Sequence, residues 1–154
     1  MGHGGGSFVY PNAVPSFEQV YYQNTISTDL HCFNTCDPVV NMAFVISKMM
    51  GIGMPLYDLI ERTTINPARV INRSDLGTLN AGNPADIALF EIVKGDFSFA
   101  DTSGGKNYGK QLIRSIMTVA GGRVGFDLYG LSYPYWEDVP KENDYWRNPS
   151  GIDH

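Results

Sequence analysis

Hydrophobic positions in the first half of the chain predict helices around one short strand. Phe17, Val20 and Tyr21 recur at helical spacing within residues 15–23, which predicts a helix. Residues 26–30 (ISTDL) are predicted to form a short buried strand that ends in polar residues. A lone buried strand needs paired neighbours, and the first half of the chain does not provide them. This segment therefore indicates one piece of a larger β/α layer.

Three helices are predicted after this strand. The first has Asp37 as N-cap and Pro38 in the first helical position, and it is apolar on most sides, so it should be buried. Its methionines are most simply core residues. The second helix is predicted to start at Pro55. Asn66, again an N-cap residue followed by proline, predicts the start of the third helix.

The pattern changes to strands in the second half. Residues 85–93 read as a strand, and residues 97–100 alternate with period two. Residues 112–119 and 123–128 flank the dipeptide Gly121-Gly122, which favours a two-residue hairpin turn. The remaining residues, 130–154, are rich in proline, aromatic and polar side chains and are predicted to be irregular.

Composition narrows the class of protein. The net charge of −5 without a basic stripe argues against nucleic acid or anionic membrane as a partner. No apolar run is long enough for a bilayer, and the N-terminus lacks the pattern of a signal peptide. Cys32 and Cys36 do not make a disulfide framework for 154 residues. We therefore expect a cytoplasmic, reduced protein.

Three short motifs follow one another along the chain and resemble consecutive segments of one family of barrel enzymes. Residues 2–8 (GHGGGSF) resemble the loop after the seventh barrel strand, and residues 27–31 (STDLH) resemble the end of the eighth. Residues 64–69 (TINPAR), with 76–79 (LGTL), Gly82 and 85–88 (ADIA), resemble the passage out of the barrel. In this order the three motifs resemble the C-terminal third of the amidohydrolase superfamily, closest to its deacetylase-like and dihydroorotase-like members. The resemblance covers residues 2–127.

The resemblance implies an α/β fold, the C-terminal fragment of a (β/α)8 TIM-barrel metallohydrolase followed by a small β-sandwich segment. Residues 1–75 would be the end of the barrel. Residues 76–128 would belong to the β-sandwich domain, and residues 129–154 would form an irregular aromatic and polar tail.

The resemblance also assigns candidate site residues. Asp29 matches the family's catalytic aspartate, which is also a metal ligand. His3, Gly4, Gly5 and His31 are candidates for substrate binding. A divalent metal, with zinc as the expected ion, would activate water in the complete enzyme. The chain has three histidines and no His-x-His, so it supplies at most one ligand, Asp29.

Structural roles compete with each of these assignments. Asp29 has the alternative of a strand-end carboxylate that caps the following loop. His3 and His31 have the alternative of ordinary hydrogen-bonded or solvent-facing side chains, and the glycine run that of a flexible tail. Cys32 and Cys36 lack the second ligand pair that makes a zinc site convincing.

The resulting expectation is a hydrolase of non-peptide amide, cyclic amide or ester bonds in small molecules, with deacetylation as one candidate reaction. Full activity would require the N-terminal barrel part, in the same or another chain, and the full-length form is a candidate homo-oligomer. The alternative is a non-catalytic remnant or assembly module without a metal site.

Overall fold

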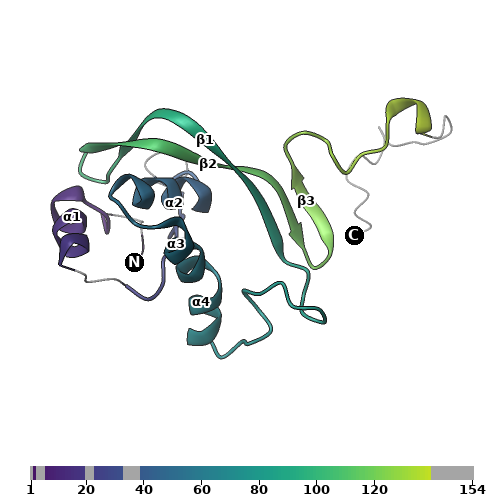
Figure 1. The fold of residues 1–154 in the computed structure, drawn as a ribbon, viewed down its shortest axis with the longest axis horizontal. Coiled ribbons are helices and arrows are strands. Elements are labelled where there is room, and N and C mark those ends of the chain that lie inside the picture. Colours follow the sequence, from purple (N-terminus) through teal and green to yellow (C-terminus); the bar gives the residue numbers. More distant parts are fainter. Residues whose placement is uncertain (1, 3–5, 20–22, 33–38, 140–154) are drawn as a thin grey trace.

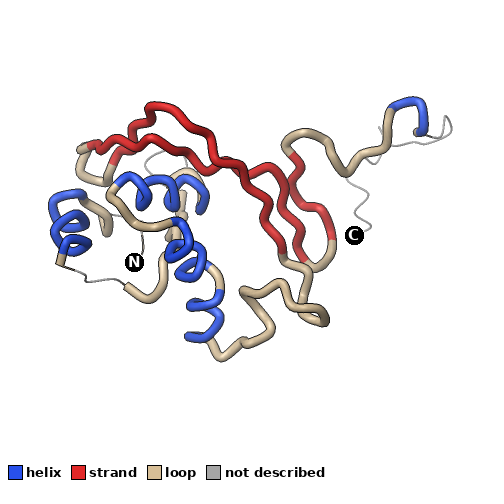
Figure 2. Tube along the Cα trace, viewed as in Figure 1, coloured by secondary structure: helices blue, strands red, loops and turns tan. Residues whose placement is uncertain are grey.

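The computed structural model describes residues 2, 6–19, 23–32 and 39–139 of the chain. A layer of short helices covers part of one face of a long, twisted β hairpin (Figures 1 and 2). The helices are α1 (Tyr10–Glu18), α2 (Met42–Gly51), α3 (Leu56–Thr63) and α4 (Ile65–Val70). The strands are β1 (Ile87–Ala100), β2 (Lys106–Ala120) and β3 (Arg123–Asp127), and a short 3-10 helix, η1, spans Trp136–Asp138.

The predicted helices are present, but their starts differ from the prediction. Helix α1 begins at Tyr10, five residues earlier than expected, because its first turn accommodates a proline. Helix α4 begins at Ile65 with Thr64 as its N-cap, so Asn66 is not the cap. Asp37 and Pro38 lie outside the described residues.

The N-cap of α2 is Asn41, whose side-chain Oδ1 accepts a hydrogen bond of 2.8 Å from the Phe44 N–H. We expect Asn41→Ala to lower the free energy of unfolding by about 1 kcal/mol, because the Phe44 N–H would lose this acceptor. Asn41→Ser restores a capping oxygen and serves as the control. Urea denaturation of both variants measures the effect, and equal stability of the two would contradict the assignment.

The segment 26–30 is not a strand, contrary to the prediction. Ile26 is buried as expected, but its N–H donates to the Arg62 carbonyl of α3 at 3.0 Å. A strand exists only where another strand pairs with it. Within the described residues this segment pairs with the end of a helix instead.

The β region is one antiparallel sheet in the order β1-β2-β3. The two predicted strands at 85–93 and 97–100 are one strand, β1, whose pairing with β2 shifts register between Lys94 and Phe97. The predicted hairpin turn is confirmed, since Gly121 and Gly122 have φ of 55° and 80°. No second sheet occurs in the described part of the chain, so the predicted β-sandwich stays a prediction.

Helix α2 packs against β2 through apolar and polar contacts. Met49 lies in the core, as predicted, with Val45, Ile46 and Ile113. Ser47 is also fully buried, and its Oγ donates to the Ala43 carbonyl and accepts from the Ile113 N–H at 2.8 Å. These two bonds join helix and strand by a polar link inside an apolar core.

The part of the sheet that contains β3 extends beyond the helices (Figure 2). Large apolar side chains are exposed there, among them Ile87, Leu89, Val124, Phe126 and Leu128. Residues 128–139 are irregular apart from η1, as predicted for the tail, and residues 140–154 lie outside the description. No helix in the described ranges is long and apolar enough to cross a membrane.

Candidate functional site

Asp29 lies in an exposed position with an unusual backbone conformation. Its φ is 49°, in the left-handed region that few residues other than glycine adopt. Aspartate and asparagine tolerate this region better than most residues, at some cost in strain. Strained residues that the surrounding structure holds in place are concentrated at functional sites. Val40 and Asn72 have similar positive φ values, so the conformation is compatible with both the functional and the loop-capping role of Asp29.

Helix α3 holds the segment that leads to Asp29. The Ile26 N–H is bonded to the Arg62 carbonyl, as described above, and the Arg62 guanidinium donates to the Gln23 carbonyl. Both bonds connect the end of one helix to consecutive parts of one extended segment. The path of the chain into Asp29 is thereby fixed by α3.

The first glycine of the N-terminal loop lies beside Asp29. A Cβ built on Gly2 would lie 3.6 Å from Ser27 Oγ, 3.7 Å from Asp29 Cβ and 3.8 Å from Asp29 Oδ2. The structure thus brings together two of the three motifs. His3, Gly4 and Gly5 lie outside the described residues, and His31 is half-buried two residues after Asp29.

A hollow of about 280 Å³ lies between this loop and α1. Its walls combine apolar side chains with uncharged polar ones, and they are formed by Gly2, Ser7, Phe8, Val9, Asn12, Ala13, Ser16 and Gln23. Asn12 and Ser16 are not among the site residues predicted from the sequence, because the predicted helix covers residues 15–23 and leaves Asn12 outside it. In α1 the two residues are four positions apart and therefore lie on one face.

The buried carboxylate of the described residues is Asp101, in the turn between β1 and β2. Its Oδ2 accepts from the Tyr10 N–H at 2.9 Å, and its Oδ1 accepts from the Ser103 N–H and Oγ at 2.9 Å and from the Gly105 N–H at 2.8 Å. Burial alone would raise the pKa of Asp101, but these hydrogen bonds to the charged form outweigh it and hold the pKa at about 2.

Protonation of Asp101 should destabilise the fold. Because its pKa is depressed in the folded state from 3.8 to about 2, the stabilisation is complete above pH 4 and is lost as the pH falls from 4 to 2. We expect Asp101→Asn to remove the part of the acid sensitivity that arises in this window. Urea midpoints at pH 6, 4 and 2.5 for both proteins measure it, and parallel pH dependences would contradict the assignment.

Comparison with known proteins places this geometry in a family. Residues 23–117, which include Asp29, match the family described as Amidohydrolase family. The chain belongs to the amidohydrolase family. This amidohydrolase chain is 38% identical over 104 residues to a deacetylase of Brucella anthropi. The aligned residues cover 68% of this chain and 26% of that relative.

Two solved amidohydrolase-like structures have a similar fold. An adenine deaminase matches with a TM-score of 0.76 and 30% identity over 81% of this chain and 34% of its own. A dihydroorotase matches with a TM-score of 0.72 and 32% identity over 79% of this chain and 33% of its own. The chain thus spans about a quarter to a third of the proteins it matches, and it corresponds to a C-terminal part of this family, as expected.

The described residues of this amidohydrolase chain do not form a complete metal site. No three histidine, cysteine, aspartate or glutamate side chains come together among them. Asp29 fits a single ligand position, since it is an exposed carboxylate. Cys32 is exposed and forms no disulfide, and Cys36 lies outside the described residues.

Proposed function

We propose that this chain supplies the catalytic aspartate of a metal-dependent hydrolase that acts on non-peptide amide, cyclic amide or ester bonds of small molecules. The observation that carries the proposal is the place of Asp29, whose carboxylate lies beside the Gly2 backbone inside the region that matches the amidohydrolase family. Removal of an acetyl group is one candidate reaction, because the Brucella anthropi relative is a deacetylase.

Asp29 would act as the proton carrier of the reaction. Its carboxylate accepts the proton of the attacking water and then gives it to the leaving nitrogen or oxygen. A divalent metal, zinc by expectation, would be held in part by Asp29 and would lower the pKa of the bound water. The remaining ligands would come from the N-terminal barrel part, in the same or another chain.

The substrate would lie between the glycine loop and Asp29. We propose that His3, Gly4, Gly5 and His31 contact it, with backbone N–H groups of the loop binding a carbonyl or anionic oxygen. The hollow beside Gly2 has uncharged walls that suit a neutral polar or aliphatic group of the substrate. A folded module without catalysis is less favoured, because the family match includes Asp29.

In the complete protein, residues 1–75 would close the barrel, residues 76–128 would join the small β domain and residues 129–154 would form the tail. The exposed apolar part of the sheet, which includes Leu89 and Phe126, agrees with this arrangement. Such side chains are normally covered by another layer or subunit. Assembly as a homo-oligomer would also cover them.

A segment exchange tests the proposed reaction. The 104-residue segment of the Brucella anthropi deacetylase that matches this chain would be replaced by the matching residues of this chain. The purified chimera, loaded with zinc, would be tested on N-acetyl, O-acetyl and cyclic amide substrates. We expect metal-dependent hydrolysis of at least one class. A folded, zinc-loaded chimera that hydrolyses none of them would contradict the proposal.

A further inference from the structure

We propose that the turn between β1 and β2 is a positioning element for the candidate site, with Asp101 and Thr102 as its positioning residues. The turn belongs to the β region and contains none of the predicted site residues, yet it binds the segment that follows the glycine loop. The importance of this turn for catalysis rests on the proposed function. The effect of the turn on the position of the loop is independent of the proposed function, and it is tested by a separate measurement.

Asp101 and Thr102 bind the backbone on both sides of Val9. Asp101 Oδ2 accepts from the Tyr10 N–H at 2.9 Å, at the start of α1. The Phe8 carbonyl accepts from the Thr102 hydroxyl at 2.7 Å and from the Thr102 N–H at 3.2 Å. These contacts join residues more than 90 positions apart in the chain. They fix the exit of the loop to the end of the hairpin.

Neighbouring side chains strengthen the same connection. The Tyr10 hydroxyl donates to the Phe99 carbonyl at 2.9 Å. Lys48 of α2 is fully buried, donates to the Ala100 carbonyl and lies 5.4 Å from the centre of the Phe8 ring. Phe8 itself is 1% exposed. The loop exit is therefore held by strand, turn and helix at once.

The turn is closed by hydrogen bonds of its own, in addition to those that it forms with the loop exit. The Asp101 N–H donates to the Gly105 carbonyl at 2.8 Å, while Asp101 Oδ1 accepts from the N–H groups of Ser103 and Gly105. Gly104 has a φ of 85°, which a residue with a side chain adopts only with strain. The Asp101 carboxylate closes its own turn and also accepts from the distant Tyr10 N–H. The position of Tyr10 therefore depends on the position of the turn at the end of the sheet.

The position of Gly2 beside Asp29 would depend on this anchor. Gly2 lines the same hollow as Phe8 and Val9, so the backbone that the turn binds lies next to Gly2. We infer that loss of the Phe8 and Tyr10 contacts moves Gly2 away from Asp29 and leaves the sheet intact.

The test is the nuclear Overhauser effect between the Gly2 Hα and Asp29 Hβ protons in the full 154-residue chain. Thr102→Val keeps the side-chain shape and removes the hydroxyl donor to Phe8, and Asp101→Ala removes the acceptor for Tyr10. Asp101→Asn keeps one side-chain oxygen and should rescue part of the effect. Asp127→Asn is the matched control, because Asp127 accepts from the Ser132 N–H and Oγ at 2.7 Å in a comparable turn.

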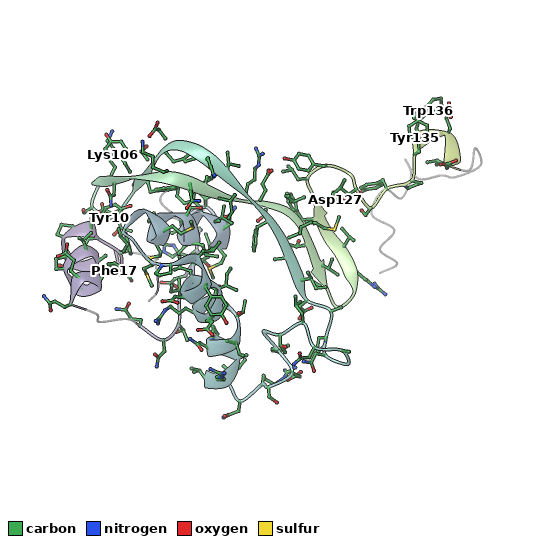
Figure 3. The ribbon with its side chains drawn as sticks, viewed as in Figure 1. Tyr10, Phe17, Lys106, Asp127, Tyr135 and Trp136 are labelled. Carbon is green, nitrogen blue, oxygen red and sulfur yellow. The ribbon has the colours of Figure 1, made fainter. Side chains whose placement is uncertain are left out.

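Figure 3 shows why the control is suitable: Asp127 lies well away from Tyr10 and Lys106, toward the side of the molecule that carries Tyr135 and Trp136. We expect the Gly2–Asp29 effect to be lost in Asp101→Ala and weakened in Thr102→Val. It should be partly restored in Asp101→Asn and unchanged in Asp127→Asn. Effects between Thr118 and Phe126, which pair across β2 and β3, should persist in all variants.

Two results would overturn the inference. One is an unchanged Gly2–Asp29 effect in a folded Thr102→Val or Asp101→Ala chain, and the other is an equal loss in Asp127→Asn. In the segment-exchange chimera, Thr102→Val should raise KM several-fold with a smaller change in kcat, because the residues that line the hollow beside Gly2 are displaced. An inactive chimera would count against the proposed function alone, since the proton–proton contact is measured without catalysis.

Discussion

Asp29→Asn is expected to lower kcat of the segment-exchange chimera by about 10²–10⁴-fold, the usual contribution of a positioned acid–base group. The amide has nearly the shape of the carboxylate, but it neither accepts the proton of the attacking water nor returns one to the leaving group. Asparagine also tolerates the left-handed conformation with φ of 49° found at Asp29. Folding should therefore be preserved while turnover is lost.

The control for this prediction is the stability of the 154-residue chain. Asp29→Asn should change its free energy of unfolding by less than about 0.5 kcal/mol, as expected of an exposed substitution. Bound zinc per chimera, measured together with kcat, separates loss of the metal from loss of proton transfer. A chimera with normal turnover after Asp29→Asn would show that another group carries the proton.

Gly77→Ala is expected to lower the free energy of unfolding by more than about 3 kcal/mol, because two separate penalties add. Gly77 has a φ of 69°, where a side chain adds about 1–2 kcal/mol of strain. A Cβ there would also lie 2.6 Å from the Thr64 carbonyl carbon and oxygen, which are backbone atoms between α3 and α4. The backbone of one segment must then move.

Gly82→Ala is the matched control for Gly77. Gly82 has a φ of 93°, but no atom lies within 4 Å of a Cβ built on it. Its substitution carries only the conformational penalty, about 1–2 kcal/mol. Urea denaturation at constant pH measures both variants. Equal losses at the two positions would show that the close approach of Gly77 to Thr64 does not hold in solution.

Much of the local structure could be predicted from the sequence, because it depends on local chemistry. The Gly121-Gly122 turn fixes its own hairpin, and the apolar character of α2 requires burial whatever its neighbours are. Element starts were less predictable. Asn41 and Asp37 are both good cap residues, and only the structure shows that Asn41 accepts the Phe44 N–H.

The candidate site was predictable only where a motif carried it. Asp29 was identified from its resemblance to a family, and its left-handed backbone could not be read from sequence. Asp101 was missed because its role depends on Tyr10, which lies 91 residues away. Segment 26–30 is predicted to be a strand, but a strand also requires a partner, and local sequence does not contain that information.

The most direct test of the central claim is the turnover of the segment-exchange chimera on a substrate that the Brucella anthropi deacetylase itself hydrolyses. The claim is that Asp29 of this chain acts as the catalytic acid–base group of an amidohydrolase. It predicts that the folded, zinc-loaded chimera hydrolyses that substrate and that Asp29→Asn abolishes the reaction. A folded, zinc-loaded chimera that does not hydrolyse the substrate of its parent would contradict it.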